Sequence, residues 1–200
     1  MNFKPQLPNW GYNLAENKLE LLIEYHKWLK DTGIKTGLIS PKSDQFIWDE
    51  FIVHSLYFSF IFQDLDVQNK QIFDLGTGGG IPGVPLAITS KNIINLVDIK
   101  ESRINELIRL KNILKLENIV PTLQDANNTI VNEGYFVSRC YISSQKALTL
   151  LKKRKNTTYI VSGTEKELDY DKNVFHVKHL NFYINKEDLR HLDVITVKWK

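Results

Sequence analysis

The architecture of this 200-residue chain follows from one segment, Asp74-Leu75-Gly76-Thr77-Gly78-Gly79-Gly80-Ile81-Pro82-Gly83. The apolar run of residues 72–75 predicts a strand, and Pro82 suits the first turn of a following helix, where a missing N–H costs little. Glycines between a strand and a helix allow positive φ angles and let a ligand approach the backbone closely. Five glycines within eight residues are more than a tight turn alone requires, so the segment predicts a ligand-binding loop.

Beyond this loop, short apolar runs alternate with helical stretches. Strands are predicted at residues 93–97, 119–123, 135–138 and 158–161, with a closing pair over residues 174–177 and 194–199. A helix is predicted over residues 101–116, with Ile108 among its apolar positions. This alternation is typical of a parallel sheet that carries helices on both faces and binds ligands along the edge where the strands end.

Two helices are predicted before the loop. Apolar residues at helical spacing predict the first over residues 16–30. The second, around residues 46–62, includes Asp49, Glu50 and His54, so it is too charged and too short to cross a membrane and is predicted to be a buried helix. We therefore expect a helical extension over residues 1–68, packed on an α/β domain over residues 69–200, as one globular unit.

Composition limits the classes of protein that the chain can belong to. With 42% apolar and 24% charged residues, it is typical of a soluble globular protein. A net charge of +3 permits an acidic partner such as nucleic acid without requiring one. Cys140 is the single cysteine, which excludes an internal disulfide framework, and we expect it to be a buried thiol. We assign no metal and no membrane, and the amino terminus lacks the pattern of a signal peptide, so we expect a cytoplasmic protein.

Two classes of ligand compete for the glycine loop. Residues 78–83 satisfy the dinucleotide pattern G-x-G-x-x-G, with Asp98 at the spacing of a ribose-binding carboxylate, which would indicate a nicotinamide-dependent oxidoreductase. Asp74 followed by alternating glycines instead resembles the first motif of methyltransferases that use S-adenosylmethionine. A carboxylate before the loop opposes a pyrophosphate, whereas it attracts an ammonium and a sulfonium. Asp74 therefore favours the methyl donor.

The loop and its surroundings resemble one family closely. The run from Phe73 to Ile88, with its Pro-Gly-x-Pro-Leu ending, resembles the signature of the glucose-inhibited division protein B family, the small-subunit ribosomal RNA guanine-N7 methyltransferases. Leu96-Val97-Asp98 and Ser138-Arg139 follow in family order, and His26-Lys27-Trp28 resembles a family helix. The resemblance spans roughly residues 25–163.

The resemblance implies a Rossmann-like S-adenosylmethionine-dependent methyltransferase fold, α/β, with a mostly parallel, twisted seven-stranded sheet and an amino-terminal helical extension. It implies methyl transfer to N7 of a guanine in 16S ribosomal RNA, with ribosomal RNA or the small ribosomal subunit as partner and a monomeric enzyme. The residues that it places at the cofactor are Asp74, Gly76, Thr77, Gly78, Gly80, Pro82, Asp98, Ile99, Asp125 and Ala126.

The resemblance also implies catalytic positions. Arg139 would orient guanine through O6 or hold a phosphate, although a surface ion pair is the ordinary role of such an arginine. His54 is the second catalytic candidate, beside the alternative of a buried structural histidine. The basic run Lys152–Lys155 would contact phosphates or form a solvated face.

Several positions depart from the family pattern. Val53 replaces an arginine before His54, Tyr57 replaces an aspartate, and Ser102 replaces a lysine. Asp125 and Ser162 also differ from the usual residues. These departures keep two further hypotheses open: a member that binds cofactor or RNA without turnover, and a methyltransferase with another substrate. A nicotinamide oxidoreductase is the weakest alternative.

Overall fold

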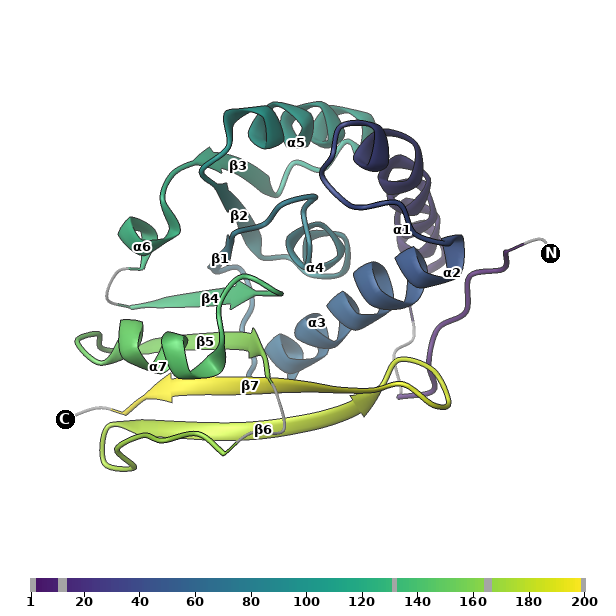
Figure 1. Cartoon of the computed structure of the whole chain (residues 1–200). Helices are drawn as coiled ribbons and strands as arrows, with labels where there is room; N and C mark the ends of the chain where they lie inside the picture. Colours follow the sequence, from purple (N-terminus) through teal and green to yellow (C-terminus); the bar gives the residue numbers. More distant parts are fainter. Residues whose placement is uncertain (1–2, 11–13, 131–132, 164–166, 199–200) are drawn as a thin grey trace.

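The computed structural model describes residues 3–10, 14–130, 133–163 and 167–198. Within them lies a seven-stranded sheet of order β3-β2-β1-β4-β5-β7-β6 (Figure 1). The first five strands are parallel, and β7 runs antiparallel between β5 and β6. The strands are β1 Gln71–Leu75, β2 Ile93–Asp98, β3 Ile119–Leu123, β4 Gly134–Ser138, β5 Thr157–Ser162, β6 Phe175–Tyr183 and β7 Leu189–Val197. The predicted α/β fold with a mostly parallel sheet is confirmed.

The helical segments precede the sheet or connect its strands. They are α1 Glu16–Trp28, η1 Leu29–Gly33, α2 Asp44–Phe46, η2 Ile47–Val53, α3 His54–Asp64, α4 Gly83–Thr89, α5 Glu101–Leu114, α6 Ala126–Thr129 and α7 Ser144–Leu151. The predicted buried helix is the continuous run from α2 to α3, whose middle part, η2, is a π-helix. None of the helices in the described ranges is long and apolar enough to cross a membrane.

Two hydrophobic clusters cover the two faces of the sheet. The first joins the face of Ile72 and Ile94 to α1, α3, α4 and α5. The second joins the face of Leu75 and Val97 to α6 and α7. Helices therefore cover both faces, as the alternation predicted (Figure 1). The first cluster also holds Trp48 of η2, so the amino-terminal helices share the core of the sheet.

Some details differ from the sequence-based expectations. Ile108 is 45% exposed, because α5 packs through the positions on its other side, and α5 ends at Leu114, where Lys115 adopts a left-handed conformation. Pro82 precedes α4 at the N-cap, with φ −90° and ψ 3°, and is not in its first turn. The closing strands β6 and β7 are longer than expected, and Trp199 lies outside the described residues.

The strand order places a crevice beside β1. The chain passes from β1 to β2 on one side, whereas β4 pairs with β1 on the other side. Connections that leave in opposite directions open a crevice at the carboxyl ends of parallel strands. The loop after β1 and the residues after β4 border this crevice.

Candidate functional site

The buried side chain of Asp74 holds the two ends of the glycine loop together. This side chain is completely buried, and its Oδ2 accepts hydrogen bonds from Thr77 Oγ1 at 2.6 Å and from Gly83 N at 2.8 Å. A Cβ at Gly83 would lie 2.6 Å from that same oxygen, so a larger residue there would break the arrangement. Burial, supplemented by the charge of Asp98, raises the pKa of Asp74 to about 7 despite these hydrogen bonds. Among the described residues, Asp74 Oδ1 has no hydrogen-bond partner.

The loop is also held by its neighbours in the fold. The amides of Gly76 and Thr77 both donate to the carbonyl of Val97 on β2, at 2.9 and 3.0 Å. From α1, the Tyr25 hydroxyl donates to the carbonyl of Gly79 at 2.8 Å. The amino-terminal helices thus help to fix the loop that the sequence singled out.

Asp98 connects the loop to the start of α5. Its Oδ2 accepts from Gly78 N at 3.1 Å and from Arg103 Nη1 at 3.0 Å, while Oδ1 accepts from Lys100 N at 3.0 Å. Its side chain is 3% exposed, and that of Arg103 is 31% exposed. The carboxylate is therefore fixed in direction at the end of β2.

A cavity of about 390 Å³ opens above these residues. Its size falls in the range of about 300–1,000 Å³ that is usual for small-molecule sites. Two carboxylates and exposed Ile99 face it, which suits a ligand with hydroxyls or positive charge and an apolar part. Its lining consists of Gly76, Val97, Asp98, Ile99, Arg103, Gln124, Asp125, Ala126, Asn127, Cys140 and Tyr141.

The predicted cofactor residues divide into two groups. Those that line the cavity are Gly76, Asp98, Ile99, Asp125 and Ala126. Those that form or support the loop outside the lining are Asp74, Thr77, Gly78, Gly80 and Pro82. Direct contact of the second group with a ligand stays a prediction.

The prediction of a buried thiol at Cys140 is wrong. Cys140 is exposed and faces the cavity, because the chain turns there with a left-handed φ of 57°. That turn directs Tyr141 to the cavity as well, one residue farther from the end of β4.

Arg139 and His54, 85 residues apart in sequence, meet in a buried ionic cluster. Arg139 Nε lies 3.3 Å from His54 Nδ1, and its Nη2 donates to Glu50 Oε2 at 2.8 Å. Glu50 also binds Arg190 of β7, whose Nε donates to Oε1 at 3.1 Å and whose Nη2 contacts the same oxygen. The Arg139 side chain is only 10% exposed, so it forms a buried ion pair and not a surface one.

The cluster fixes the protonation states of its members. Burial alone would raise the pKa of Glu50, but its neighbours His54, Arg190 and Arg139 outweigh burial and lower that pKa to about 2. Burial, together with the charges of the two arginines, lowers the pKa of His54 to about 4. His54 is therefore neutral at pH 7, and since a guanidinium only donates, Nδ1 is the acceptor and Nε2 carries the proton.

His54 Nε2 is buried and has no hydrogen-bond partner within the described ranges. Its ring lies edge-on to Phe182, with centroids 5.3 Å apart, and stacks on Phe58 with centroids 6.1 Å apart and an interplanar angle of 26°. Aromatic side chains thus flank the ring, and its Nδ1 side faces Arg139 and Glu50, whose Oε2 lies 3.8 Å from Nδ1.

Sequence reasoning missed Glu50, Arg190, Gln124 and Tyr141. Gln124 directly follows one predicted strand and Tyr141 comes three residues after the end of another, so their position at the carboxyl edge was a usable signal. Glu50 was noted only as a charge in an apolar stretch, and nothing local distinguishes Arg190, which meets Glu50 across 140 residues of chain.

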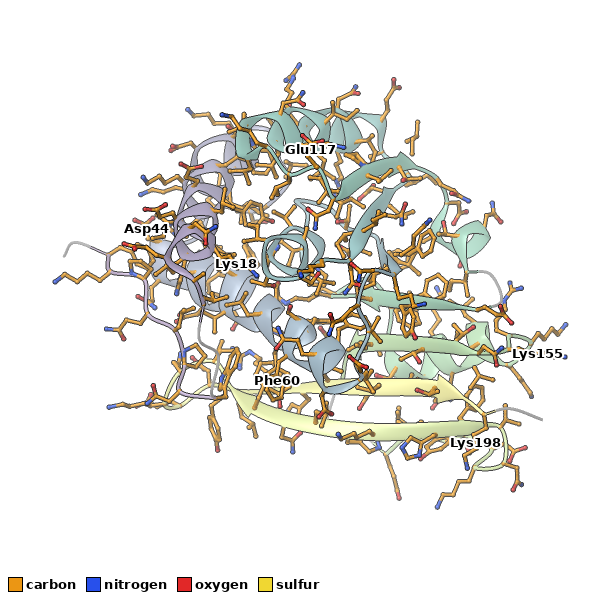
Figure 2. All side chains as sticks on the ribbon, turned by 180° about the vertical axis from the view of Figure 1, so that it is seen from behind. Lys18, Asp44, Phe60, Glu117, Lys155 and Lys198 are labelled. Atoms are coloured by element: carbon orange, nitrogen blue, oxygen red, sulfur yellow. The ribbon has the colours of Figure 1, made fainter. Side chains whose placement is uncertain are left out.

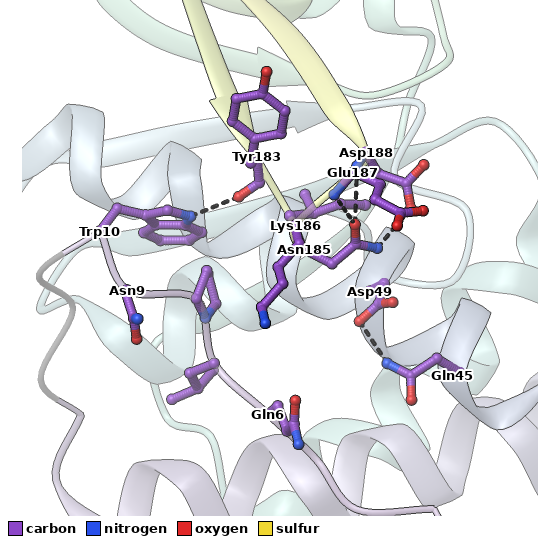
Figure 3. A pocket seen from close by; sticks show the side chains of 13 residues that line it. Gln6, Asn9, Trp10, Gln45, Asp49, Tyr183, Asn185, Lys186, Glu187 and Asp188 are labelled. Atoms are coloured by element: carbon purple, nitrogen blue, oxygen red, sulfur yellow. Dashed lines mark hydrogen bonds between the residues drawn. The ribbon is translucent and has the colours of Figure 1, made fainter.

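Another cavity lies apart from the cavity beside the glycine loop. A larger cavity of about 710 Å³ lies between residues 6–10, η2 and the β6–β7 turn, where Trp10 Nε1 donates to the carbonyl of Tyr183 at 2.8 Å (Figure 3). No predicted site residue lines this cavity. In the described ranges, no group of three or more His, Cys, Asp or Glu side chains is placed to hold a metal ion.

The basic run Lys152–Lys155 comes just before β5, so it lies at the amino edge of the parallel strands, opposite the edge that carries the glycine loop. Figure 2 shows Lys155 on the same side of the molecule as Lys198 and on the opposite side from Asp44. A phosphate contact by this run stays a prediction.

Solved structures share this fold. Magnesium protoporphyrin IX methyltransferase from Synechocystis PCC 6803 matches with a TM-score of 0.57 at 14% identity, covering 88% of this chain and 99% of that one. An rRNA methylase from Streptococcus thermophilus matches with a TM-score of 0.50 at 15% identity, covering 72% of this chain and 96% of that one. At such low identity these likenesses concern the fold alone, and the predicted Rossmann-like methyltransferase fold is confirmed.

Curated relatives carry the name ribosomal RNA small subunit methyltransferase G. The protein from Chlorobium chlorochromatii is 38% identical over 108 residues, which are 53% of this chain and 45% of that protein. The protein from Chlorobaculum tepidum is 33% identical over 111 residues, or 55% and 50% of the two chains. The chain thus spans half or less of the length of these relatives.

A family model extends the likeness along most of the chain. The model described as rRNA small subunit methyltransferase G matches residues 18–192, from α1 to β7. The glycine loop, the Asp98 carboxylate and the Arg139 cluster all fall within that range. The chain therefore belongs to the GidB family, the family of rRNA small subunit methyltransferase G.

Proposed function

We propose that the chain is an enzyme that uses S-adenosylmethionine to methylate N7 of a guanine in small-subunit (16S) ribosomal RNA. One observation carries the proposal: the glycine loop is tied to Asp98 at a cavity of about 390 Å³, in a chain that belongs to the GidB family. The cavity supports S-adenosylmethionine as the cofactor, and membership of the family supports ribosomal RNA as the substrate.

The residues around the cavity fit the parts of S-adenosylmethionine. Asp98 offers a fixed carboxylate to ribose hydroxyls, and Ile99, which is 68% exposed, offers apolar surface to a base. Asp74 Oδ1 is a buried acceptor without a partner in the described ranges, which suits a ligand that carries positive charge. When bound, the cofactor supplies an electrophilic methyl group.

Guanine N7 carries an in-plane lone pair, so this transfer needs no general base. The chain has to orient the base and stabilise the charges around it. Arg139 leaves the end of β4 beside the cavity residues Cys140 and Tyr141, and we assign it the grip on guanine O6 or on a phosphate. We assign His54 a positioning role, because its Nδ1 accepts from Arg139 while aromatic rings enclose the rest of its ring.

The proposal also concerns the domain organisation of the chain and its location in the cell. Residues 1–68 act as a helical extension of the α/β domain over residues 69–200, forming one globular unit. A hydrophobic cluster common to both parts supports the single globular unit. The protein acts as a monomer in the cytoplasm, on ribosomal RNA or on the small ribosomal subunit. Sedimentation of the purified protein with and without small ribosomal subunits tests the monomeric state and the binding to subunits.

Radiolabelled methyl transfer tests the activity. Small ribosomal subunits from a strain that lacks the corresponding methyltransferase are incubated with the protein and labelled S-adenosylmethionine, and the labelled nucleotide is identified after digestion. We expect N7-methylguanine in 16S RNA and no product with Arg139→Ala. Label in another nucleotide would show that the enzyme has a different substrate. Absence of label while the cofactor is bound would contradict the proposal that the chain is an enzyme.

A second candidate function is binding of cofactor or RNA without turnover. The observation that favours it is that the guanidinium of Arg139 already donates hydrogen bonds to Glu50 and His54 and is buried. Calorimetric titration with S-adenosylmethionine, S-adenosylhomocysteine and NAD distinguishes the candidates when combined with the transfer assay. Binding of the two sulfur compounds without transfer would favour this second function, whereas binding of NAD alone would exclude both.

A further inference from the structure

Tyr141 lies directly on the first glycine of the loop. A Cβ built at Gly76 would be 2.3 Å from Tyr141 Cδ2 and 2.6 Å from Cγ, so the ring occupies the space that any side chain at Gly76 would fill. Gly76 itself has a φ of +70°, which also favours glycine. The sequence predicted that the missing side chain admits a ligand, but its nearest neighbour in the structure is an aromatic ring.

The ring faces the same cavity as the loop and two carboxylates. Gly76, Asp98, Asp125 and Tyr141 all line it, and Tyr141 is 39% exposed. Partial burial, together with the charges of Asp125 and Asp98, raises the pKa of Tyr141, so the hydroxyl stays neutral. An aromatic face close to two anions is a favourable environment for a cation.

We propose that the ring of Tyr141 contacts the sulfonium of S-adenosylmethionine and makes the site prefer this cation to the neutral S-adenosylhomocysteine. The inference rests on the proposed function. In the cofactor, the sulfonium joins the ribose to the amino acid part. With the ribose at Asp98 and the amino acid part at the loop that begins with Gly76, the sulfonium lies between these residues, where Tyr141 is the aromatic side chain of the lining.

Calorimetry with both sulfur compounds tests the assignment. We compare the wild type with Tyr141→Phe, which keeps the ring, and Tyr141→Leu, which removes it. Tyr183→Leu, at an exposed tyrosine of β6 outside this cavity, is the matched control. A cation–π contact is worth roughly twofold to thirtyfold in affinity. We therefore expect Tyr141→Leu to lower the ratio of the two affinities about fivefold in favour of S-adenosylhomocysteine, and Tyr141→Phe and Tyr183→Leu to keep the wild-type ratio.

The outcomes distinguish failure of the Tyr141 assignment from failure of the proposed cofactor. If Tyr141→Leu binds both compounds with the wild-type ratio, or binds both more tightly, the ring makes no contact specific to the sulfonium. The inference is then wrong, while the cofactor proposal stands. If the wild type binds neither compound, both are wrong. If Tyr141→Leu fails to fold, Tyr141→Trp keeps an aromatic face and is expected to retain the preference, and its loss would overturn the assignment.

Discussion

At the scale of single residues, Asp74 combines two roles that pH separates. Burial raises the pKa of Asp74 from 3.8 to about 7. Between these two pH values the folded state therefore holds a proton that the unfolded state has released. Its contribution to stability is therefore present below pH 3.8 and is lost as pH rises through 7. The same carboxylate, once ionised, attracts a cationic ligand.

We predict that Asp74→Asn removes this pH dependence. The amide oxygen can accept the two hydrogen bonds from Thr77 and Gly83, so the loop should keep its shape. The melting temperature of the variant relative to that of the wild type should then rise between pH 5 and pH 8, because only the wild type loses the Asp74 contribution, while the affinity of the variant for S-adenosylmethionine at pH 8 drops several-fold. Asp64→Asn, at an exposed carboxylate of α3, is the control and should change neither quantity. Equal melting curves for Asp74→Asn and wild type at all pH values would contradict the prediction.

Glu50 is the anion between two arginines. We predict that Glu50→Gln destabilises the fold by about 3 kcal/mol, because Arg139 would keep a buried charge without its partner. Urea unfolding at pH 7 measures this loss. Asp49→Asn, at the neighbouring residue that accepts from Gln45, is the matched control with a loss below about 1 kcal/mol.

The cluster also predicts sensitivity to acid. The pKa of His54 is lowered from 6.5 to about 4, and that of Glu50 from 4.5 to about 2. In both cases the unfolded state binds protons first, so the stabilisation is present above the unfolded pKa and is lost on acidification. The contribution of this cluster to stability should fall from pH 6.5 downward, opposite in sign to that of Asp74, and Glu50→Gln should flatten the part of the curve below pH 4.5.

At the scale of elements, α1 supports the glycine loop. We predict that Tyr25→Phe, which removes the hydrogen bond to the Gly79 carbonyl, costs about 1 kcal/mol of stability and weakens binding of S-adenosylhomocysteine. Denaturant unfolding and calorimetry measure the two effects. Tyr183→Phe, at an exposed tyrosine, should leave both unchanged. Unaltered ligand affinity in Tyr25→Phe would show that the loop keeps its shape without this hydrogen bond from α1.

Most elements could be predicted because their signals are local. The apolar runs before Gly76 and Asp98 identified β1 and β2, and glycine density identified the loop. The short helices α6 and α7 were missed, since eight residues or fewer are shorter than the window of about 11–18 residues over which helical spacing is recognised. The π-helical part of the buried helix was missed as well, because its seven residues are too few for a changed side-chain spacing to be recognised.

At the scale of the whole molecule, the edge that holds the site could be predicted from strand alternation alone. The pairing of Glu50 with Arg190 could not, because antiparallel β7 must first bring Arg190 to the carboxyl edge of the parallel strands. Likewise, only the tertiary structure shows that Arg139 is buried by an amino-terminal helix. The candidate cofactor residues were thus partly predictable, whereas the candidate substrate side depended on long-range contacts.

The left-handed turn at Cys140 gives the molecule a natural chemical reporter. The sequence contains a single cysteine, and that thiol is exposed in the wall of the cavity. A coloured disulfide reagent should therefore label one position, and its rate should report whether the cavity is filled. We predict that saturating S-adenosylhomocysteine slows labelling several-fold, that NAD does not, and that Cys140→Ser abolishes it. Labelling at an unchanged rate with ligand bound would place the ligand elsewhere. Occupancy of the cavity can thus be followed in solution without a transfer assay or any added probe residue.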